Sequence, residues 1–316
     1  MSIQNLINEI ADKDTKLTSS HLADLSQMTV VELSIFKKAW DTINTTRRRK
    51  IISQLTELTK DNVELNFDLI FKHALSDPDA EVRASAIDGL WENDDPLLIN
   101  KLINLMQNDS SDNVQASAAA ALGKFVLLVE CEEIRQSYKT TLNQALLPII
   151  DDIKKPIEVR RRALEAIAPL SMPSVREAIK KAYESRDERF TISAIYAMGR
   201  TCDYAWLPIL YKEMDNVDAE IRYEAAGACG EIGMEESISH LVEHIHDPDI
   251  EVRLSVIQSL AKIGGTEAKN SLQRVARDNN IAIREAIEQA LAEIETMETM
   301  TLFQMNASRD QDDNRN

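Results

Sequence analysis

The sequence predicts an all-α protein, a right-handed superhelical solenoid of about eight helical pairs. The first observation is composition: the 316 residues include only 8 Gly and 8 Pro, and 44% are hydrophobic while 5% are aromatic. Such a chain suits helices better than sheets. The second is a pattern that recurs every 31 residues along most of the chain, and the third is an apolar stripe at helical spacing within each copy. A fixed period of this length is the signature of stacked repeats.

The recurring position, called the marker below, begins the second helix of each pair. The last four intervals between markers are all 31 residues, and the markers are Val82, Val114, Val159, Phe190, Ile221, Val252 and Ile283. The marker and the residues four and eight positions later are apolar, so we expect them in the core. The ninth position is Gly or Ala in six of seven copies, which predicts that neighbouring second helices approach closely there. Trp91 is the exception.

The turn before the marker is acidic. Asp79 and Asp249 stand where helix N-caps are expected, and Glu81 and Glu251 follow in the first turn, where the helix dipole favours negative charge. In three copies an Asp lies six residues before the Arg that follows the marker: Asp77/Arg83, Asp247/Arg253 and Asp278/Arg284.

These features carry a resemblance. The Asp-x5-Arg spacing, the DPDxEVR turn and the small residues near the helix end resemble HEAT repeats, specifically the short kind of phycobilisome-lyase-like proteins. The resemblance covers residues 63–296 and implies an α-solenoid, a fold that serves many functions.

The chain is organised around these repeats. We expect an N-terminal helix and linker over 1–20 and a degenerate capping repeat over 21–62, whose Thr29 and Glu32 match a capping box. The HEAT-like repeats follow over 63–296, with an insertion near 126–139 that lengthens the flanking helices. The C-terminal extension covers 297–316, and its last ten residues are expected to be disordered.

Charge and cysteine usage limit the function classes. The net charge of −17 repels nucleic acid and anionic membranes, and favours a partner with a basic segment. Three scattered cysteines fit a reducing compartment, the N-terminus lacks a signal-peptide pattern, and the apolar runs are too short to span a bilayer. We therefore expect a cytoplasmic protein that binds neither nucleic acid nor membrane.

The basic runs 47–50 and 160–162 raise the question of nucleic acid directly. HEAT-like alkyl-DNA glycosylases are similar in architecture and bind DNA along a basic concave face. Here the corresponding face is expected to be mainly acidic, so we interpret both runs as solvated or ion-paired helix starts.

A metal-dependent activity is the sharpest catalytic hypothesis. The repeats are similar to those of deoxyhypusine hydroxylases, and this resemblance implies two irons held by His-Glu pairs at the second and third positions after the marker. No copy has His there, and only Tyr223-Glu224 places a carboxylate as required. We therefore expect no enzymatic activity and no cofactor.

His240 and His244 are weak metal candidates, because an i, i+4 pair can chelate zinc on one helix face. Two ligands are too few for a structural zinc site, so the favoured interpretation is a solvated surface and no metal.

The function predicted from these observations is a non-catalytic protein-binding scaffold or adaptor with an acidic concave surface. The third, sixth and tenth positions after each marker are expected to form this surface. Trp91 is interpreted mainly as a space-filling residue, with an interface role as the alternative. The partner-binding candidates are Asp88, Glu92, Glu165, Tyr196, Arg200, Glu224, Glu231 and Trp91.

A bilin lyase, or a chaperone-like factor acting on a chromoprotein, is the alternative from another class, because phycobilisome-lyase-type chains are similar in repeat form. The sequence leaves open the identity of the partner, the oligomeric state and the role of the insertion.

Overall fold

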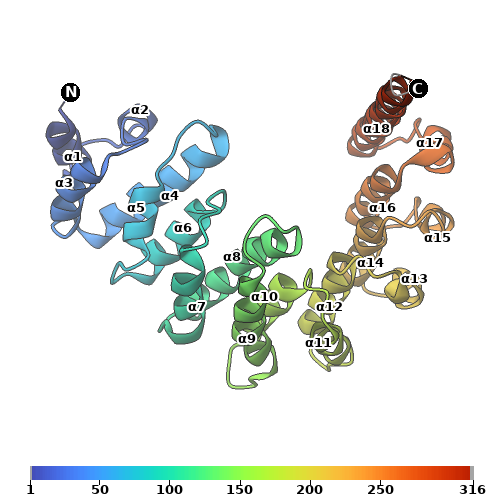
Figure 1. Cartoon of the computed structure of the whole chain (residues 1–316), viewed down its shortest axis with the longest axis horizontal. Coiled ribbons are helices and arrows are strands. Elements are labelled where there is room, and N and C mark those ends of the chain that lie inside the picture. Colours follow the sequence, from blue (N-terminus) through green and yellow to red (C-terminus); the bar gives the residue numbers. More distant parts are fainter. Residues whose placement is uncertain (1, 314–316) are drawn as a thin grey trace. The chain divides into compact units, whose positions relative to one another are not determined.

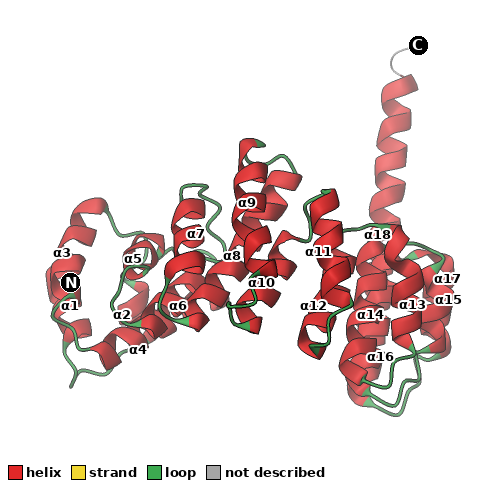
Figure 2. Cartoon of the chain, turned by 90° about the horizontal axis from the view of Figure 1, so that it is seen from below, coloured by secondary structure: helices red, strands yellow, loops and turns green. Residues whose placement is uncertain are grey.

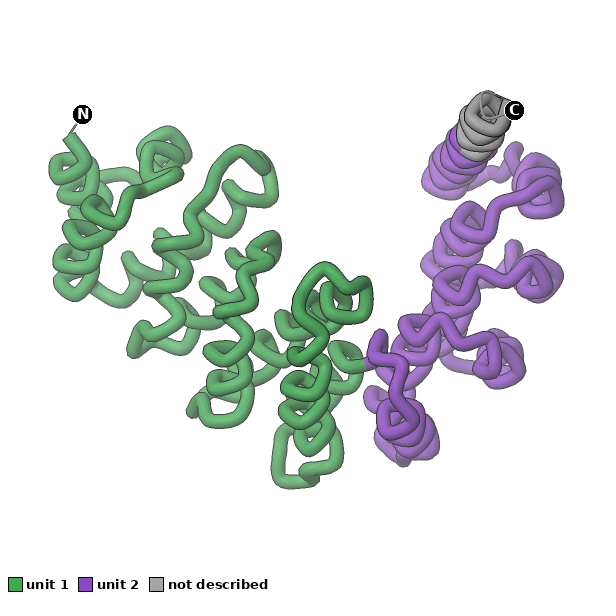
Figure 3. The backbone as a smooth tube through the Cα atoms, viewed as in Figure 1, with its two compact units in different colours: residues 1–167 green, residues 168–316 purple. Residues whose placement is uncertain are grey.

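The computed structural model describes the backbone of residues 2–313 and the side chains of residues 2–300, and it is all-α over this range (Figure 1). The chain divides into two compact units, residues 1–167 and 168–316 (Figure 3). The helices of the first unit are α1 (Ile3–Ala11), α2 (Ser19–Ala23), α3 (Val30–Trp40), α4 (Thr45–Asp61), α5 (Asp68–Ala74), α6 (Ala80–Gly89), α7 (Leu98–Asn108), α8 (Asp112–Glu130), α9 (Ser137–Asp151) and α10 (Ile157–Ile167). Those of the second are α11 (Pro173–Tyr183), α12 (Glu188–Arg200), a 3-10 turn (Tyr204–Trp206), α13 (Leu207–Met214), α14 (Ala219–Ile232), α15 (Ser237–Glu243), α16 (Ile250–Ile263), α17 (Gly265–Arg274) and α18 (Ile281–Asp313).

Each unit is a stack of helical pairs. The first helix of a pair packs on the second, as α7 does on α8 and α13 on α14, and the second helices pack on one another in the orders α4–α6–α8–α10 and α12–α14–α16–α18. From α5/α6 to α17/α18 the described chain forms seven such pairs, and α3 and α4, which pack on α5 and α6 respectively, continue the stack toward the N-terminus. The predicted all-α solenoid of helical pairs is confirmed.

The core follows the predicted stripe. All seven markers are at most 6% exposed, and the residues four positions later are fully buried. In the eighth position Leu291 is half-buried, in contrast to the buried Leu260 of the preceding repeat. Leu291 lies on α18, which packs on α16 and α17 and is the last helix among the described residues, so in this part of the chain no following pair covers it.

Close approach at the ninth position is also confirmed. A Cβ on Gly199 of α12 would lie 2.7 Å from the Cα of Ala228, and a Cβ on Gly230 of α14 would lie 2.7 Å from the Cα of Ser259. Real Cβ atoms do not approach backbone this closely, so only Gly lets these second helices pack at this separation.

Buried ion pairs connect successive turns. Arg222 donates from Nε and Nη2 to Asp247 of the next repeat at 2.8 Å each, while its Nη1 donates to the backbone carbonyl of Asn216 in its own turn at 2.9 Å. Arg83 binds Asp109 and the carbonyl of Asp77 in the same way. The Arg that follows the marker therefore pairs with the acidic turn of the following repeat. The N-cap roles of Asp79 and Asp249 and the capping box at Thr29 are confirmed.

The two ends differ in construction. At the N-terminus α1 packs on α3 and α2 packs on α4, so these short helices form an additional pair. At the C-terminus α18 extends beyond the other helices of its unit (Figure 2). The expected disorder of the last ten residues falls outside the part of the chain whose side chains are described. Around the insertion, α8 and α9 have 19 and 15 residues.

Within the described residues no helix is both long and apolar enough to cross a membrane.

Candidate functional site

Three successive second helices of the second unit, α12, α14 and α16, form a groove of about 160 Å³. It contains four of the predicted partner-binding residues: Tyr196, Arg200, Glu224 and Glu231. Most of the lining falls at the third, sixth, seventh and tenth positions after the markers, because these positions lie on the side of the second helix opposite the buried stripe. The groove is therefore built from the repeat itself.

The charge of this groove is balanced. Glu231 on α14 accepts from Arg200 on α12 at 3.1 Å and pairs with Lys262 on α16 on its other side. Although burial opposes the shift, the hydrogen bonds and charges of Lys262 and Arg200 lower the pKa of Glu231. The expected acidic lining is thus corrected for this groove: Glu231 lies between two cations and is paired with both of them.

Lys262 was missed by the sequence reasoning, as was Lys124 in the first unit. Both occupy the tenth position after their markers, the same column as Arg200 and Glu231. A comparison of the tenth position in every repeat, including its basic residues as well as its acidic ones, would have found both lysines.

Two tyrosines provide the exposed apolar surface of the groove. Tyr196 is 41% exposed and Tyr223 is 37% exposed, and the lining also includes Gly227, which has no side chain. Ser255 Oγ donates to the carbonyl of Tyr223 at 2.9 Å, which fixes α16 against α14 beneath the ring. An exposed aromatic on a fixed backbone is a typical contact residue of protein interfaces.

An acidic edge borders the groove. A shallow recess of about 330 Å³ at the N-terminal ends of α14 and α16 is lined by Tyr223 together with Glu220, Asp249 and Glu251. At the neighbouring end of α12, the hydrogen bond and charge of Asp218 raise the pKa of Glu188, because two carboxyl groups are crowded together. Tyr223 belongs to both surfaces, so the balanced groove continues into an acidic edge.

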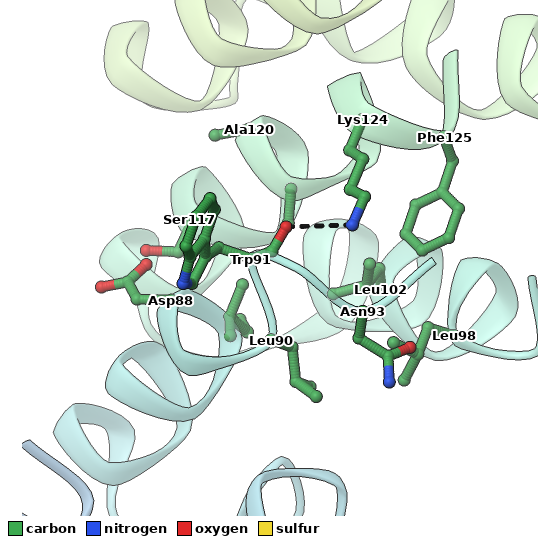
Figure 4. Close-up of a pocket in the computed structure, with 12 residues that line it drawn as sticks. Asp88, Leu90, Trp91, Asn93, Leu98, Leu102, Ser117, Ala120, Lys124 and Phe125 are labelled. Carbon is green, nitrogen blue, oxygen red and sulfur yellow. Dashed lines mark hydrogen bonds between the residues drawn. The ribbon is translucent and has the colours of Figure 1, made fainter. Parts of the chain in front are cut away.

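The first unit has a separate pocket of about 250 Å³ between α6, α7 and α8 (Figure 4). Its floor is apolar and includes Leu98, Leu102 and Phe125, all at most 5% exposed. Asp88 and Trp91, two of the predicted partner-binding residues, lie at its rim.

Trp91 does not fill space in the core, which corrects its main interpretation. Its side chain is 51% exposed, and its carbonyl accepts from Lys124 Nζ at 3.1 Å. The reason is that α6 ends at Gly89, whereas α14 and α16 continue past their ninth position. The chain leaves the helix before Trp91, so the close helix contact made by Gly in other repeats is replaced by an open pocket.

Two further predicted residues lie outside both cavities. Glu92 is exposed, and Glu165 is half-buried and bound to Arg162 at 2.8 Å. The basic run 160–162 is ion-paired through Glu158 and Glu165, and in the run 47–50 Arg48 and Arg49 pair with Asp77 and Asp79. The interpretation of these runs as ion-paired helix starts is confirmed for these residues.

Neither metal hypothesis finds a suitable set of donors. His240 stacks on Tyr211 with ring centroids 3.8 Å apart, and His244 bonds to the carbonyl of His240 at 3.0 Å and to Asp215 at 3.3 Å. No cluster of three or more His, Cys, Asp or Glu side chains able to hold a metal occurs in the described part of the chain. At the iron-ligand positions of the hydroxylase resemblance, Ser255 instead binds a backbone carbonyl, and the residues present do not fit an iron centre.

Comparison with known proteins identifies the repeats. The HEAT-repeat family matches residues 68–137 and 207–292, which fall in the stacked pairs of both units. Both matched ranges therefore consist of HEAT repeats. Its fold is similar to the complex of CpcE and CpcF of phycocyanin lyase from Nostoc sp. PCC7120, with a TM-score of 0.52, 16% identity, and coverage of 90% of this chain and 97% of that one. It is also similar to a chain of the Kap95:Nup1 complex, with a TM-score of 0.54, 13% identity, and coverage of 97% and 47%.

Sequence comparison corrects the expectation about catalysis. Deoxyhypusine hydroxylase of Drosophila melanogaster is 30% identical over 107 residues, which cover 33% of this chain and 35% of that protein. The chain matches about a third of the length of the curated relatives, and all four bear the name of this enzyme. The sequence-based prediction that the chain is not an enzyme was therefore wrong.

Proposed function

We propose that this protein is a scaffold or adaptor that binds a partner protein through the exposed face of its second helices. The observation that carries the proposal is the groove over α12, α14 and α16, which brings together Tyr196, Arg200, Glu224 and Glu231 from successive repeats. Repeat proteins use such extended surfaces for recognition, because each repeat contributes a few side chains at fixed positions. A similar fold occurs in the Kap95:Nup1 complex, which supports the use of this architecture for protein binding.

The partner's contact segment is basic and carries at least one apolar residue. Tyr196 and Tyr223 offer apolar surface, and the acidic edge beside Tyr223 offers the exposed carboxylates of Glu220 and Glu251 to Lys or Arg. The crowding of Glu188 against Asp218 supports the same choice, since a cation placed there relieves the repulsion that raises the pKa of Glu188. The net charge of −17 adds long-range attraction for such a segment.

The bilin-lyase alternative rests on likeness of fold with the phycocyanin lyase at 16% identity, which says nothing about activity. The pocket and the groove measure about 250 and 160 Å³. Pockets for drug-sized ligands have typical volumes of about 300–1,000 Å³, so the pocket and the groove are both smaller than this range.

Site-specific photo-crosslinking tests the proposal. A photoreactive amino acid is placed at Gln258, an exposed residue in the groove, and for comparison at Ser239, an exposed residue on α15 outside it. In lysate of the source cells we expect one or more proteins to crosslink from position 258 and not from 239, and mass spectrometry identifies them.

Binding of the purified partner then tests the charge argument. Glu220→Lys/Glu251→Lys is expected to weaken binding strongly, and the matched pair Glu235→Lys/Glu236→Lys, with the same charge change outside both cavities, much less. Equal crosslinking from positions 258 and 239, or equal effects of the two double variants, contradicts the proposal.

A further inference from the structure

The pocket beside Trp91 has the size of an anchor site and lies in a unit that the groove does not reach. At about 250 Å³ it is smaller than the typical range of about 300–1,000 Å³ for pockets that enclose drug-sized molecules, but it can accept one large apolar side chain. Apolar side chains inserted in such pockets dominate the affinity of many protein interfaces.

Two hydrogen bonds hold the turn that carries Trp91 at one side of the pocket. The turn that carries Trp91 is held on both sides, because the Trp91 amide donates to the Asp88 carbonyl at 3.3 Å and the Trp91 carbonyl accepts from Lys124 Nζ at 3.1 Å. In Figure 4 the indole of Trp91 and the carboxylate of Asp88 lie toward one side of the pocket, and the ring of Phe125 lies at the other. The opening therefore lies between a turn that is hydrogen-bonded to α6 and α8 and the apolar side chains of α7 and α8.

Trp91 itself is an unusual surface residue in this chain. The chain has three tryptophans, and Trp40 and Trp206 are only 3% and 4% exposed, whereas Trp91 is 51% exposed. Trp and Tyr are enriched among the residues that dominate binding energy, since they bury a large apolar area with few rotatable bonds. A side chain of a partner can thus pack against the exposed indole and the apolar floor of the pocket at the same time.

The negative charge at the rim of the pocket favours a basic residue next to the inserted apolar side chain in the partner's sequence. No ion pair to the Asp88 carboxylate occurs among the described residues, and removal of water by the surrounding protein raises the pKa of Asp88 even though part of the residue stays exposed. The one cation in the lining, Lys124, is bound to the Trp91 carbonyl. A Lys or Arg from a partner improves the electrostatics of this rim, and an acidic residue worsens it.

We propose that this pocket is an anchor site for a partner protein, taking one Leu, Met or Phe side chain while an adjacent Lys or Arg of the same segment pairs with Asp88. The inference rests on the proposed protein-binding function and assigns to it a second contact, with a defined side-chain preference. The occupant is a peptide segment of another protein; a second copy of this chain is an outcome that the test distinguishes.

A peptide selection tests the proposal on the full chain. A random peptide library is selected on the wild-type protein and counter-selected on Trp91→Ala. We expect enrichment of an apolar residue flanked by Lys or Arg. The best peptide should protect Trp91 from acrylamide quenching, a readout that is specific because the other two tryptophans are buried.

Variants then separate the contacts. Trp91→Ala is expected to weaken the peptide at least about tenfold. Asp88→Asn is expected to weaken it about two- to fivefold, with Glu133→Gln, an exposed acid in the same unit outside the pocket, as the matched control. Ala120→Phe should block the pocket while keeping the indole, so it tests occupancy separately from the loss of Trp91.

Each outcome decides between the two proposals. If selected peptides bind but leave Trp91 open to quencher, or carry acidic flanks, the anchor site is refuted, and crosslinking from position 258 still judges the proposed function independently. If peptides bind equally to Trp91→Ala and wild type, the anchor site is likewise refuted. If Trp91 is protected by self-association in the absence of peptide, the occupant is a second copy and the proposal falls.

Discussion

Replacing Arg222 by Met tests whether buried Arg–Asp pairs hold the repeats together. Met keeps a similar side-chain length and removes the guanidinium, which makes two bonds to Asp247 at 2.8 Å each, and two to the carbonyls of Asn216 and Val217 at 2.9 and 3.2 Å. The side chains of Arg222 and Asp247 are only 12% and 5% exposed. The substitution therefore leaves a buried carboxylate without its cation.

The size of the effect follows from this burial. Removing one partner of a buried ion pair destabilises a protein by about 3–5 kcal/mol, because the remaining charge is uncompensated. Asp247 retains one bond, from the Asp249 amide at 2.8 Å, so we expect the lower end, about 3 kcal/mol. Arg49→Met is the matched control: Arg49 pairs with Asp79 and Glu81, but its side chain is 44% exposed, and exposed pairs contribute little.

Urea unfolding followed by circular dichroism measures the change. Because repeats are coupled through their nearest neighbours, the Arg222→Met transition should also become broader than that of the wild type. In a double-mutant cycle with Asp247→Asn, the second substitution should have less effect when Arg222 is already absent. A loss no larger than that of Arg49→Met, with an unchanged transition width, would refute the reasoning.

Three further predictions concern packing, thiol reactivity and pH. Gly199→Val should lower the free energy of unfolding by about 1–3 kcal/mol because its Cβ meets the backbone of α14, whereas Gly227→Ala, whose Cβ would have a nearest contact at 3.4 Å, should be neutral or slightly stabilising; thermal unfolding checks both. Burial raises the pKa of the Cys229 thiol to about 12, so at neutral pH a thiol reagent should modify the exposed Cys202 rapidly and Cys229 only on unfolding. The pKa of Asp247 is lowered in the folded state, since bonds from Arg222 and a backbone amide outweigh burial, so the stability that it contributes is complete above its unfolded pKa and is lost as the pH falls through its folded pKa. Urea unfolding from neutral to acid pH should show this loss, and Asp247→Asn should reduce its slope; an equal slope would contradict it.

The repeat architecture could be predicted because one requirement recurs in every copy. A marker such as Val252 must be buried and Gly230 must allow a neighbouring helix to approach, so the same residue types return at the same interval. The Asp-x5-Arg spacing could also be recognised in the sequence, but it does not show which residues form ion pairs. The spacing relates Asp247 to Arg253 of its own repeat, whereas in the structure Asp247 binds Arg222 of the previous repeat. Contacts between repeats depend on how the repeats pack on one another, and the residue spacing within one repeat carries no information about this packing.

The candidate sites were predicted less completely, for two physical reasons. The groove was found through its columns, but its charge was misjudged, because the field at Glu231 depends on Arg200 and Lys262 in adjacent repeats. The pocket was missed because α6 ends early at Gly89, and this local departure from the repeat changes Trp91 from a packing residue into an exposed one. Departures from a repeat are thus the places where a sequence pattern is least informative and where distinct sites arise.

The Arg200–Glu231–Lys262 chain of ion pairs has a consequence for binding kinetics. These three long side chains are already restrained by one another in the free protein, so a partner that settles on the groove restricts few additional rotamers. A surface that is ordered in advance favours recognition with little rearrangement. Solvent viscosity should therefore affect the rate of diffusional encounter, but have little effect on the step that follows encounter. Added salt should act on both steps. It weakens the Arg200–Glu231–Lys262 ion pairs that order the surface, and it screens the attraction that steers a basic segment toward it.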